Sequence, residues 1–312
     1  MLIYKLSYMN NSRRSFIKKT SFALAGAAFF SKPMYAGFAN NKITGVQLYS
    51  VRDDMKANAL GTLQELSKMG YKYVEHANYI NRKLYGYSAV EFKKILDDLG
   101  LKMPSGHTVM RSQHWDDTAK DFTSEWKYTV EDAATLQQQY VISPWMDESL
   151  RKDYDQLLRF LDLFNKSGEL CQKSGMKFGY HNHDFEFNTK VNDKLLYDII
   201  LEHTDPALVI HQIDIGNMLG AGGNAGDIIK KHPGRFASMH VKDEIKTAKG
   251  EMNSNYESTV LGKGVMPVKE IVDLGAKIGG TQHFIIEQES YQGQKPLDAM
   301  KEDLAIMKKW GY

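Results

Sequence analysis

The sequence predicts a closed (β/α)8 barrel, formed as a single α/β domain by residues 40–312. Apolar segments of strand length alternate eight times with longer segments of helical pattern, which is typical of a parallel sheet with helices outside it. A chain of 312 residues has room for eight such units, the number that closes a barrel. The alternative is an open doubly wound sheet, which usually has a glycine-rich turn after its first strand, but this chain has Ser-Val-Arg-Asp at 50–53.

The predicted strands are short apolar runs, and polar side chains follow several of them. We expect the strands at residues 43–49, 71–75, 101–107, 140–143, 177–181, 207–214, 236–241 and 283–287. The helices are expected at residues 60–69, 88–99, 123–138, 154–173, 193–202, 227–231, 268–278 and 297–310. Gly70, Gly100 and Gly175 follow the first, second and fourth helices as end signals, and Asn192 is the candidate N-cap of the fifth.

Two predicted connections are longer than a barrel needs. Residues 108–122 follow the third strand and contain Arg111, His114 and Trp115, whereas residues 243–267 follow the seventh strand and contain Gly-Lys-Gly at 262–264. Both emerge at the face where barrel enzymes carry their active sites, so we expect them to cover a substrate.

Residues 1–39 resemble a twin-arginine export signal with a linker. Arg13 and Arg14 precede an apolar run at 21–30, and Ala36 and Ala39 are the candidate cleavage positions. The run is about half as long as a membrane-spanning helix requires. The sequence therefore predicts a periplasmic or otherwise exported protein, with the twin-arginine export machinery as a partner.

The charge pattern argues against a nucleic-acid partner. The formal net charge is +2, and acidic and basic residues are interspersed without a long run of one sign. The one cysteine, Cys171, cannot form an internal disulfide and is expected in the core. A homo-oligomer is compatible with the sequence.

Four polar residues at the ends of strands five to eight predict one metal site. They are His181, Asp214, His240 and Glu287. Strand ends that lie side by side at the barrel mouth can bring these groups together, and paired carboxylates without a cation would repel each other. His183 and Glu186 are the alternatives to His181, since the segment after strand five can turn either residue toward the mouth.

Mixed imidazole and carboxylate ligands favour Mn²⁺, with Zn²⁺, Co²⁺ or Fe²⁺ as alternatives, and argue against Ca²⁺. Such an ion acts as a Lewis acid, which makes a C–H group beside a sugar carbonyl acidic enough to lose its proton. The residues therefore predict a metal-dependent isomerase or epimerase that enolises a sugar or keto-sugar.

Six segments together resemble the sugar phosphate isomerase/epimerase family with a xylose isomerase-like TIM barrel. They read Gly-Val-Gln-Leu-Tyr-Ser-Val-Arg-Asp at 45–53, Gly-Tyr-Lys-Tyr-Val-Glu at 70–75, Tyr-His-Asn-His-Asp-Phe-Glu-Phe at 180–187, Ile-Asp-Ile-Gly-Asn at 213–217, His-Val-Lys-Asp at 240–243 and Ile-Glu-Gln at 286–288. The resemblance implies a Mn²⁺-type ion held at strand ends and proton transfer on a sugar or inositol-like ring.

The resemblance also shows two departures from the ketose epimerases of this family. Those enzymes have a metal-binding glutamate where this chain has His181, and tend to have a histidine near the position of Asn217. Strand five is more similar to the inosose dehydratase and keto-glycoside branch. This similarity implies the alternative function, a lyase or hydratase that eliminates an aglycone or water.

Lys242 is the candidate base or enolate clamp, because it lies two residues after His240 and so on the same side of the strand. His107 and Glu75 are expected as acids or substrate-orienting groups, Glu287 as a catalytic residue, and Asp243 as the group that orients His240. The candidate substrate-binding residues are Gln47, His183, Glu186, Asn217 and Trp115.

The predicted substrate is a small carbohydrate, either a glycoside or a keto-sugar, because an exported enzyme would not meet cytoplasmic sugar phosphates. A non-catalytic carbohydrate-binding barrel is the alternative from another class. An AP-endonuclease-like nuclease would need a basic face, which the near-neutral charge does not provide.

Overall fold

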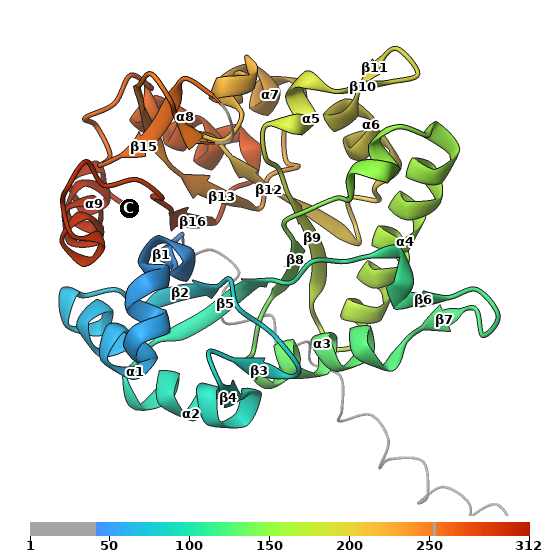
Figure 1. Cartoon of the computed structure of the whole chain (residues 1–312), viewed down its shortest axis with the longest axis horizontal. Coiled ribbons are helices and arrows are strands. Elements are labelled where there is room, and N and C mark those ends of the chain that lie inside the picture. Colours follow the sequence, from blue (N-terminus) through green and yellow to red (C-terminus); the bar gives the residue numbers. More distant parts are fainter. Residues whose placement is uncertain (1–41, 252–253) are drawn as a thin grey trace, which may run out of the picture. The chain divides into compact units, whose positions relative to one another are not determined.

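The computed structural model describes residues 42–251 and 254–312, and in this part of the chain eight parallel strands close into a barrel (Figure 1). The strands in their order around the barrel are β1 (Ile43–Gln47), β2 (Tyr73–His76), β5 (Lys102–His107), β8 (Tyr140–Ser143), β9 (Lys177–His181), β12 (Val209–Asp214), β13 (Ser238–Val241) and β16 (His283–Ile286). The barrel closes because Gly45 of β1 pairs with Tyr73 of β2 on one side and with Ile285 of β16 on the other. The predicted fold is thus confirmed, whereas the predicted export signal at 1–39 lies outside the described residues.

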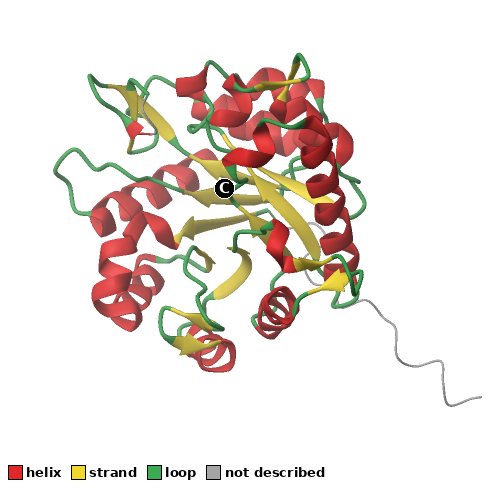
Figure 2. Ribbon diagram, turned by 45° about the vertical axis from the view of Figure 1, so that its right-hand side comes forward, coloured by secondary structure: helices red, strands yellow, loops and turns green. Residues whose placement is uncertain are grey.

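Helices surround the strands, as Figure 2 shows. The α-helices are α1 (Arg52–Met69), α2 (Ala89–Asp98), α3 (Ser124–Thr135), α4 (Tyr154–Gln172), α5 (Phe185–Asn188), α6 (Leu196–His203), α7 (Ala225–Lys231), α8 (Val268–Leu274) and α9 (Pro296–Trp310). Shorter turns are the 3-10 helices η2 (Leu48–Val51), η3 (Ser112–His114), η4 (Glu148–Arg151) and η5 (Leu219–Ala221), and the π-helix η7 (Gly275–Gly279). In the described part of the chain, no helix is both long and apolar enough to cross a membrane.

Local sequence signals explain two of the helix boundaries. Helix α1 ends at Gly70, which adopts a φ of 103° and donates its N–H to Leu66 O and Ser67 O. Helix α2 begins after Ser88, whose hydroxyl accepts from Glu91 N while the Glu91 carboxylate accepts from Ser88 N. Both boundaries agree with the prediction.

The prediction for Asn192 is wrong. Asn192 (φ 51°) and Asp193 (φ 62°) form the turn of a hairpin between β10 (Lys190–Val191) and β11 (Lys194–Leu195). Helix α6 therefore begins only at Leu196. Asparagine and aspartate tolerate left-handed backbone, so the pair suits a hairpin turn as well as a helix start.

Three further hairpins lie at the C-terminal side of the barrel strands. They pair β3 (Lys83–Leu84) with β4 (Tyr87–Ser88), β6 (Trp115–Asp116) with β7 (Asp121–Phe122), and β14 (Asp243–Lys246) with β15 (Tyr256–Thr259). The two long connections predicted at 108–122 and 243–267 thus contain ordered hairpins.

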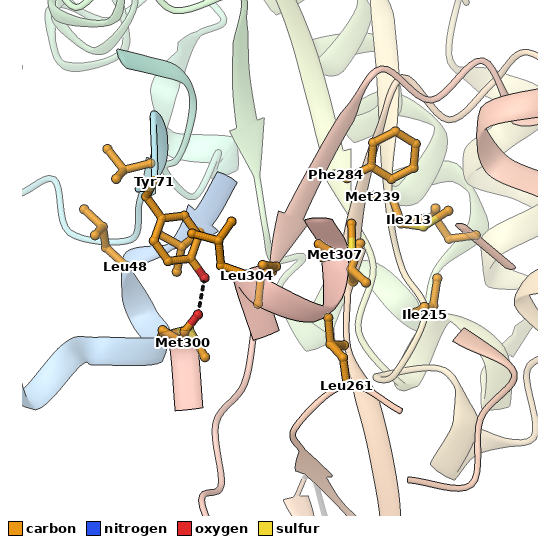
Figure 3. Close-up of a cluster of buried hydrophobic side chains, with 14 of the residues drawn as sticks. Leu48, Tyr71, Ile213, Ile215, Met239, Leu261, Phe284, Met300, Leu304 and Met307 are labelled. Carbon is orange, nitrogen blue, oxygen red and sulfur yellow. Dashed lines mark hydrogen bonds between the residues drawn. The ribbon is translucent and has the colours of Figure 1, made fainter. Parts of the chain in front are cut away.

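The core lies between the barrel and the surrounding helices. In the cluster of Figure 3, Tyr71 lies beside Leu48 and Leu304, and its hydroxyl donates to Met300 O at 2.7 Å. This bond joins the start of the second barrel unit to the last helix α9. Cys171 is buried in a second cluster, as expected, and its burial raises the pKa of its thiol to about 12.

Candidate functional site

Asp214, His240 and Glu287 come together at the C-terminal ends of β12, β13 and β16, each with one potential ligand atom within 4.8 Å of the others. His240 Nδ1 lies 3.0 Å from Glu287 Oε2 and 3.7 Å from Asp214 Oδ2. All three residues are buried. The structure therefore brings three of the four predicted ligands into one group.

His181 belongs to a second group, which shares His240 with the first. Its ring centroid is 4.6 Å from that of His240 and 4.8 Å from that of His107. His107, His181 and His240 each offer a ring nitrogen within 4.8 Å of the others. The four predicted ligands thus fall into two groups that share His240.

The Asp214 carboxylate accepts hydrogen bonds through only one of its two oxygens. Its Oδ1 accepts the backbone N–H groups of Gly216 at 2.9 Å and Asn217 at 2.7 Å, while its buried Oδ2 has no hydrogen-bond partner. This oxygen lies 3.6 Å from Lys242 Nζ and 3.7 Å from His240 Nδ1, too far for hydrogen bonds but close enough for both groups to outweigh the effect of burial and hold the pKa of Asp214 below its ordinary value. The donor set of carboxylate oxygens and imidazole nitrogens around this oxygen fits a divalent cation.

Gln212 links two of the histidines. Its Oε1 accepts from His107 Nε2 at 2.6 Å and from His181 Nδ1 at 3.0 Å, and its Nε2 donates to Ser238 Oγ at 2.9 Å. An amide oxygen can only accept, so both ring nitrogens that face it carry a proton. His181 Nε2 and His107 Nδ1 are consequently the nitrogens with free lone pairs.

Glu75 lies beneath the cluster and is fully buried. It accepts from Gln47 Nε2 at 2.8 Å and from His240 Nε2 at 2.7 Å, and lies 3.2 Å from His107 Nε2. Burial raises the pKa of Glu75, but His107 and His240 outweigh this effect and hold the pKa well below its ordinary value. Glu75 is therefore a carboxylate that fixes His240 with Nδ1 toward Asp214 and Glu287.

Asp243 does not orient His240, contrary to expectation. Its carboxylate accepts backbone N–H groups from the following loop, namely Gly262 at 2.8 Å, Gly264 at 3.0 Å and Met266 at 3.3 Å. The loop containing Gly262 and Gly264 is thus folded around an internal anion. The role that the sequence assigns to Asp243 is filled by Glu75 of β2, three strands away from β13 around the barrel.

Lys242 lies below the cavity, and its surroundings argue against a neutral base. Its Nζ is 2.7 Å from Glu289 Oε1, 3.2 Å from Glu287 Oε2 and 3.6 Å from Asp214 Oδ2. Burial lowers the pKa of Lys242, but these carboxylates outweigh it and hold the pKa well above its ordinary value. In turn Lys242 and His240 overcome the effect of burial on Glu287 and lower the pKa of that carboxyl to about 2.

A cavity of about 1020 Å³ adjoins the cluster. Some of the predicted substrate-binding residues line it, and the others do not. His183 and Asn217 line it, together with His107, His181 and Glu287. Gln47 and Glu186 are fully buried outside its lining. Trp115 is also absent from the lining, since it packs edge-on against Phe122 with the ring centroids 5.1 Å apart. The structure thus places two of these five residues where a substrate can reach them.

Glu186 is turned into the core instead of toward the mouth. The Tyr180 hydroxyl donates to Glu186 Oε1, and His183 N donates to Oε2 at 2.9 Å. Of the three candidates at strand five, His181, His183 and Glu186, His181 is the one that forms a ligand group with His240. Replacing His181 with Ala is expected to lower metal retention after dialysis about 10- to 100-fold, whereas Glu186→Ala retains the metal. The reverse result would move the strand-five ligand to Glu186.

Burial raises the pKa of Glu186 to about 7, although the Tyr180 and His183 donors oppose the shift. The folded protein therefore binds a proton that the unfolded chain, with an ordinary pKa near 4.3, releases. The resulting stability is present below pH ~4.3 and is lost as pH rises through about 7.

Glu186→Gln removes this pH dependence. Between pH 5 and 8 we expect the free energy of unfolding of the variant, relative to the wild type, to rise by on the order of 2 kcal/mol. Urea titrations at the two pH values measure the difference. The glutamine also loses one of the two accepted hydrogen bonds, which changes the free energy of unfolding by the same amount at both pH values. The prediction is contradicted if the difference between variant and wild type is the same at pH 5 and at pH 8.

Sequence reasoning missed Gln212, Ser105 and Asn182. Gln212 precedes Asp214 by two residues on the same strand, so the period of two could have placed it on the same face. The Ser105 hydroxyl donates to Glu75, and Asn182 Oδ1 accepts from Asp214 N at 3.0 Å. Short polar side chains of this kind carry no distinguishing pattern in the sequence.

A family model described as xylose isomerase-like TIM barrel matches residues 63–310. An inosose dehydratase of Bacillus licheniformis is 27% identical over 192 residues, which cover 56% of this chain and 63% of that protein. The chain thus spans somewhat less than two thirds of this curated relative.

Solved structures with similar folds cover most of the chain. A sugar phosphate isomerase/epimerase from Parabacteroides distasonis is 25% identical with a TM-score of 0.70, covering 86% of this chain and 98% of that one. The IOLI protein, whose structure contains a bound zinc atom, is 12% identical with a TM-score of 0.66 over 86% of this chain and 97% of its own.

Proposed function

Because the chain belongs to the xylose isomerase-like TIM barrel family, we propose that it is a metal-dependent lyase that eliminates a substituent from a keto-sugar or keto-glycoside. Relatives and structural neighbours include carbohydrate isomerases, epimerases and dehydratases. The observation that carries the proposal is the buried group of Asp214, His240 and Glu287, in which Asp214 Oδ2 accepts no hydrogen bond, beside a cavity that Glu287 lines.

His181, Asp214, His240 and Glu287 would hold the metal, through His181 Nε2, His240 Nδ1 and the carboxylate oxygens. We propose Mn²⁺, with Zn²⁺, Co²⁺ or Fe²⁺ as alternatives, because two imidazoles disfavour Ca²⁺. When bound, such an ion supplies Lewis-acid stabilisation of negative charge on the oxygen of a neighbouring carbonyl.

His107 is the proposed base. Its Nε2 is fixed by Gln212, so Nδ1 is free to accept the proton from the carbon next to the carbonyl. The Glu75 carboxylate, 3.2 Å from His107 Nε2, then stabilises the imidazolium. As the bond between the neighbouring carbon and its leaving oxygen breaks, His107 returns the proton to that oxygen. His107 thus acts first as the base and then as the acid, and the reaction needs no other proton donor.

Two features favour elimination over epimerisation. An exchange between two bases needs a second acid or base opposite Glu287. At the end of strand five this position is taken by His181, a candidate metal ligand, and Glu186 points into the core. Lys242 is held as an ammonium among three carboxylates, so we assign it the role of balancing their charge. These contacts support a lyase, which the sequence predicts as the alternative to an isomerase or epimerase.

The substrate proposed is uncharged. The loop with Gly262 and Gly264 would be the candidate phosphate cradle, but its N–H groups already bind the Asp243 carboxylate. A neutral glycoside also agrees with the predicted export to the periplasm. We therefore do not extend the phosphate in the family's common name to this chain.

Incubation of the Mn²⁺-loaded protein with a 3-keto-glycoside in D₂O tests the proposal. A lyase breaks the C2–H and C1–O bonds, forms a C1=C2 double bond and releases the aglycone, which the absorbance of the conjugated ketone reports. Deuterium at C2 with the aglycone retained would instead identify an isomerase or epimerase. Binding without either change would identify a carbohydrate-binding barrel.

A further inference from the structure

The cavity extends well beyond the candidate metal ligands. Its lining combines His181, His183 and Glu287, which belong to the units of β9 and β16, with residues of the connection after β2 and with Glu125 and Tyr128 of α3. Its volume of about 1020 Å³ reaches the upper end of the roughly 300–1,000 Å³ typical of sites for drug-sized ligands. A single sugar ring at the metal ligands would therefore leave part of the cavity unfilled.

Exposed apolar side chains gather around this cavity. Tyr49, Ile80, Tyr128 and Trp145 line it, and their exposed fractions range from 38% to 61%. Among the described residues only three other large apolar side chains, Leu60, Val90 and Val265, are comparably exposed. Clustering of exposed apolar groups at a cavity indicates ligand binding, whereas scattered ones need no explanation.

Arg82 and Tyr128, which both line the cavity but belong to neither group of candidate metal ligands, stack on each other and form a flat surface. The Arg82 guanidinium lies 4.2 Å from the Tyr128 ring centroid. Asp132, which is buried, fixes it by accepting from Arg82 Nε at 3.0 Å and Nη2 at 2.7 Å, and also accepts from Tyr79 OH at 2.6 Å. The orientation of this flat surface is therefore set before any ligand arrives.

The backbone at Arg82 is held by a tight turn. Asn81 (φ 51°) and Arg82 (φ 61°) form a two-residue turn, closed by hydrogen bonds of Ile80 N to Lys83 O at 2.9 Å and Lys83 N to Ile80 O at 3.0 Å. This turn has the same left-handed backbone at two consecutive residues as the turn at residues 192–193. Together with the contacts of the guanidinium, it fixes the position of Arg82 at the cavity.

The charges around these residues give an anionic ligand no unpaired arginine. Arg82 is paired with Asp132, and Arg111 is paired with Asp147 at 2.5 Å, whereas the Glu125 carboxylate lies 3.7 Å from His114 Nε2. Gln113 and Glu125 also line the cavity and offer hydrogen bonds to hydroxyl groups. A flat surface beside polar groups suits a hydroxylated ring, which has both a face and an edge to bind.

We propose that Arg82, Gln113, Glu125 and Tyr128 form an outer subsite that binds a second sugar ring, so that the substrate is a disaccharide-like glycoside. The subsite deepens the proposed function, on which it rests for the position of the first ring. The ring beside the metal ligands loses the proton, while the second ring is the leaving group and is anchored at the subsite. Binding energy from this ring would then help to position the reacting one.

Calorimetric titration of the metal-loaded protein with unoxidised glycosides tests the subsite without any turnover. The ligands are methyl, phenyl and glucosyl glucosides of both anomeric configurations. We expect the preferred disaccharide to bind about tenfold more tightly than its methyl glucoside, and this ratio to fall to near one in Tyr128→Ala. Gln113→Ala should lower the ratio as well, because the hydroxyl groups lose a partner. Leu60→Ala, which removes a similarly exposed apolar side chain from α1 outside the cavity, should leave the ratio unchanged.

Equal affinities for the methyl glucosides and disaccharides, or no binding of either, would overturn the subsite. A phenyl glucoside that binds as tightly as the disaccharide and is insensitive to Gln113→Ala would overturn the assignment to a sugar. The proposed function fails separately, if keto-glycosides are bound with the expected ratio but neither eliminate nor exchange a proton.

Discussion

Replacing Asp214 with Asn is expected to lower kcat/KM on a 3-keto-glycoside by about 10³-fold or more and to strip the protein of its metal. Asp214 Oδ2 is buried, has no hydrogen-bond partner and lies 3.7 Å from His240 Nδ1. An amide in its place removes a negative charge where the cation should bind, and a loss of ~4 kcal/mol of transition-state stabilisation corresponds to this factor. Metal content after dialysis and the steady-state rate measure both effects.

Asp303→Asn is the matched control for Asp214→Asn. Asp303 is also buried, its Oδ1 accepts from Leu261 N at 2.8 Å, and its Oδ2 likewise has no partner. It belongs to α9 and contributes to neither ligand group. The control should retain its metal and its rate. Equal metal content in the two variants would contradict the proposed site.

Lys242→Met is expected to lower the free energy of unfolding by ~3–5 kcal/mol when measured in a chelator. The variant keeps the volume of the side chain but leaves Asp214, Glu287 and Glu289 without the ammonium that lies within 3.6 Å of each. Removing one partner of a buried ion pair leaves uncompensated charge in a medium that solvates it poorly. Urea unfolding followed by circular dichroism measures the loss.

Excess Mn²⁺ should restore part of this stability, because the cation replaces the lost positive charge and binds only the folded protein. Lys93→Met serves as the control, since Lys93 pairs with the exposed carboxylate of Asp97 and such surface pairs contribute ~1 kcal/mol or less. A Lys242→Met variant as stable as this control would show that the carboxylates do not depend on the ammonium.

The fold and the converging ligands were predictable for one physical reason. Parallel barrel strands have apolar side chains over most of their length, so polar residues such as Asp214 and His240 at strand ends indicate the mouth. Helix signals such as the Ser88 capping box involve only residues close in sequence, so the start of a helix can be predicted from them as well. The sequence period alone thus leads to the barrel and to the position of the site.

Predictions failed where tertiary contacts choose between equivalent side chains. His181 ends strand five and Glu186 follows it, but the hydrogen bonds from Tyr180 and His183 turn Glu186 inward. Asp243 lies near His240 in sequence, but its carboxylate accepts hydrogen bonds from backbone N–H groups of the following loop, including that of Gly262. Trp115 packs against its own hairpin. Each of these outcomes depends on a contact or a loop conformation that the periodic pattern of apolar residues in the sequence does not indicate.

The double hydrogen bond to Gln212 Oε1 makes two barrel strands depend on a residue of a third. Because one carbonyl oxygen accepts from both His107 and His181, replacing Gln212 removes the hydrogen bond of both rings at once, whereas replacing either histidine leaves the other one's bond in place. A lineage that lost this glutamine would therefore change the orientation of two site histidines in a single step.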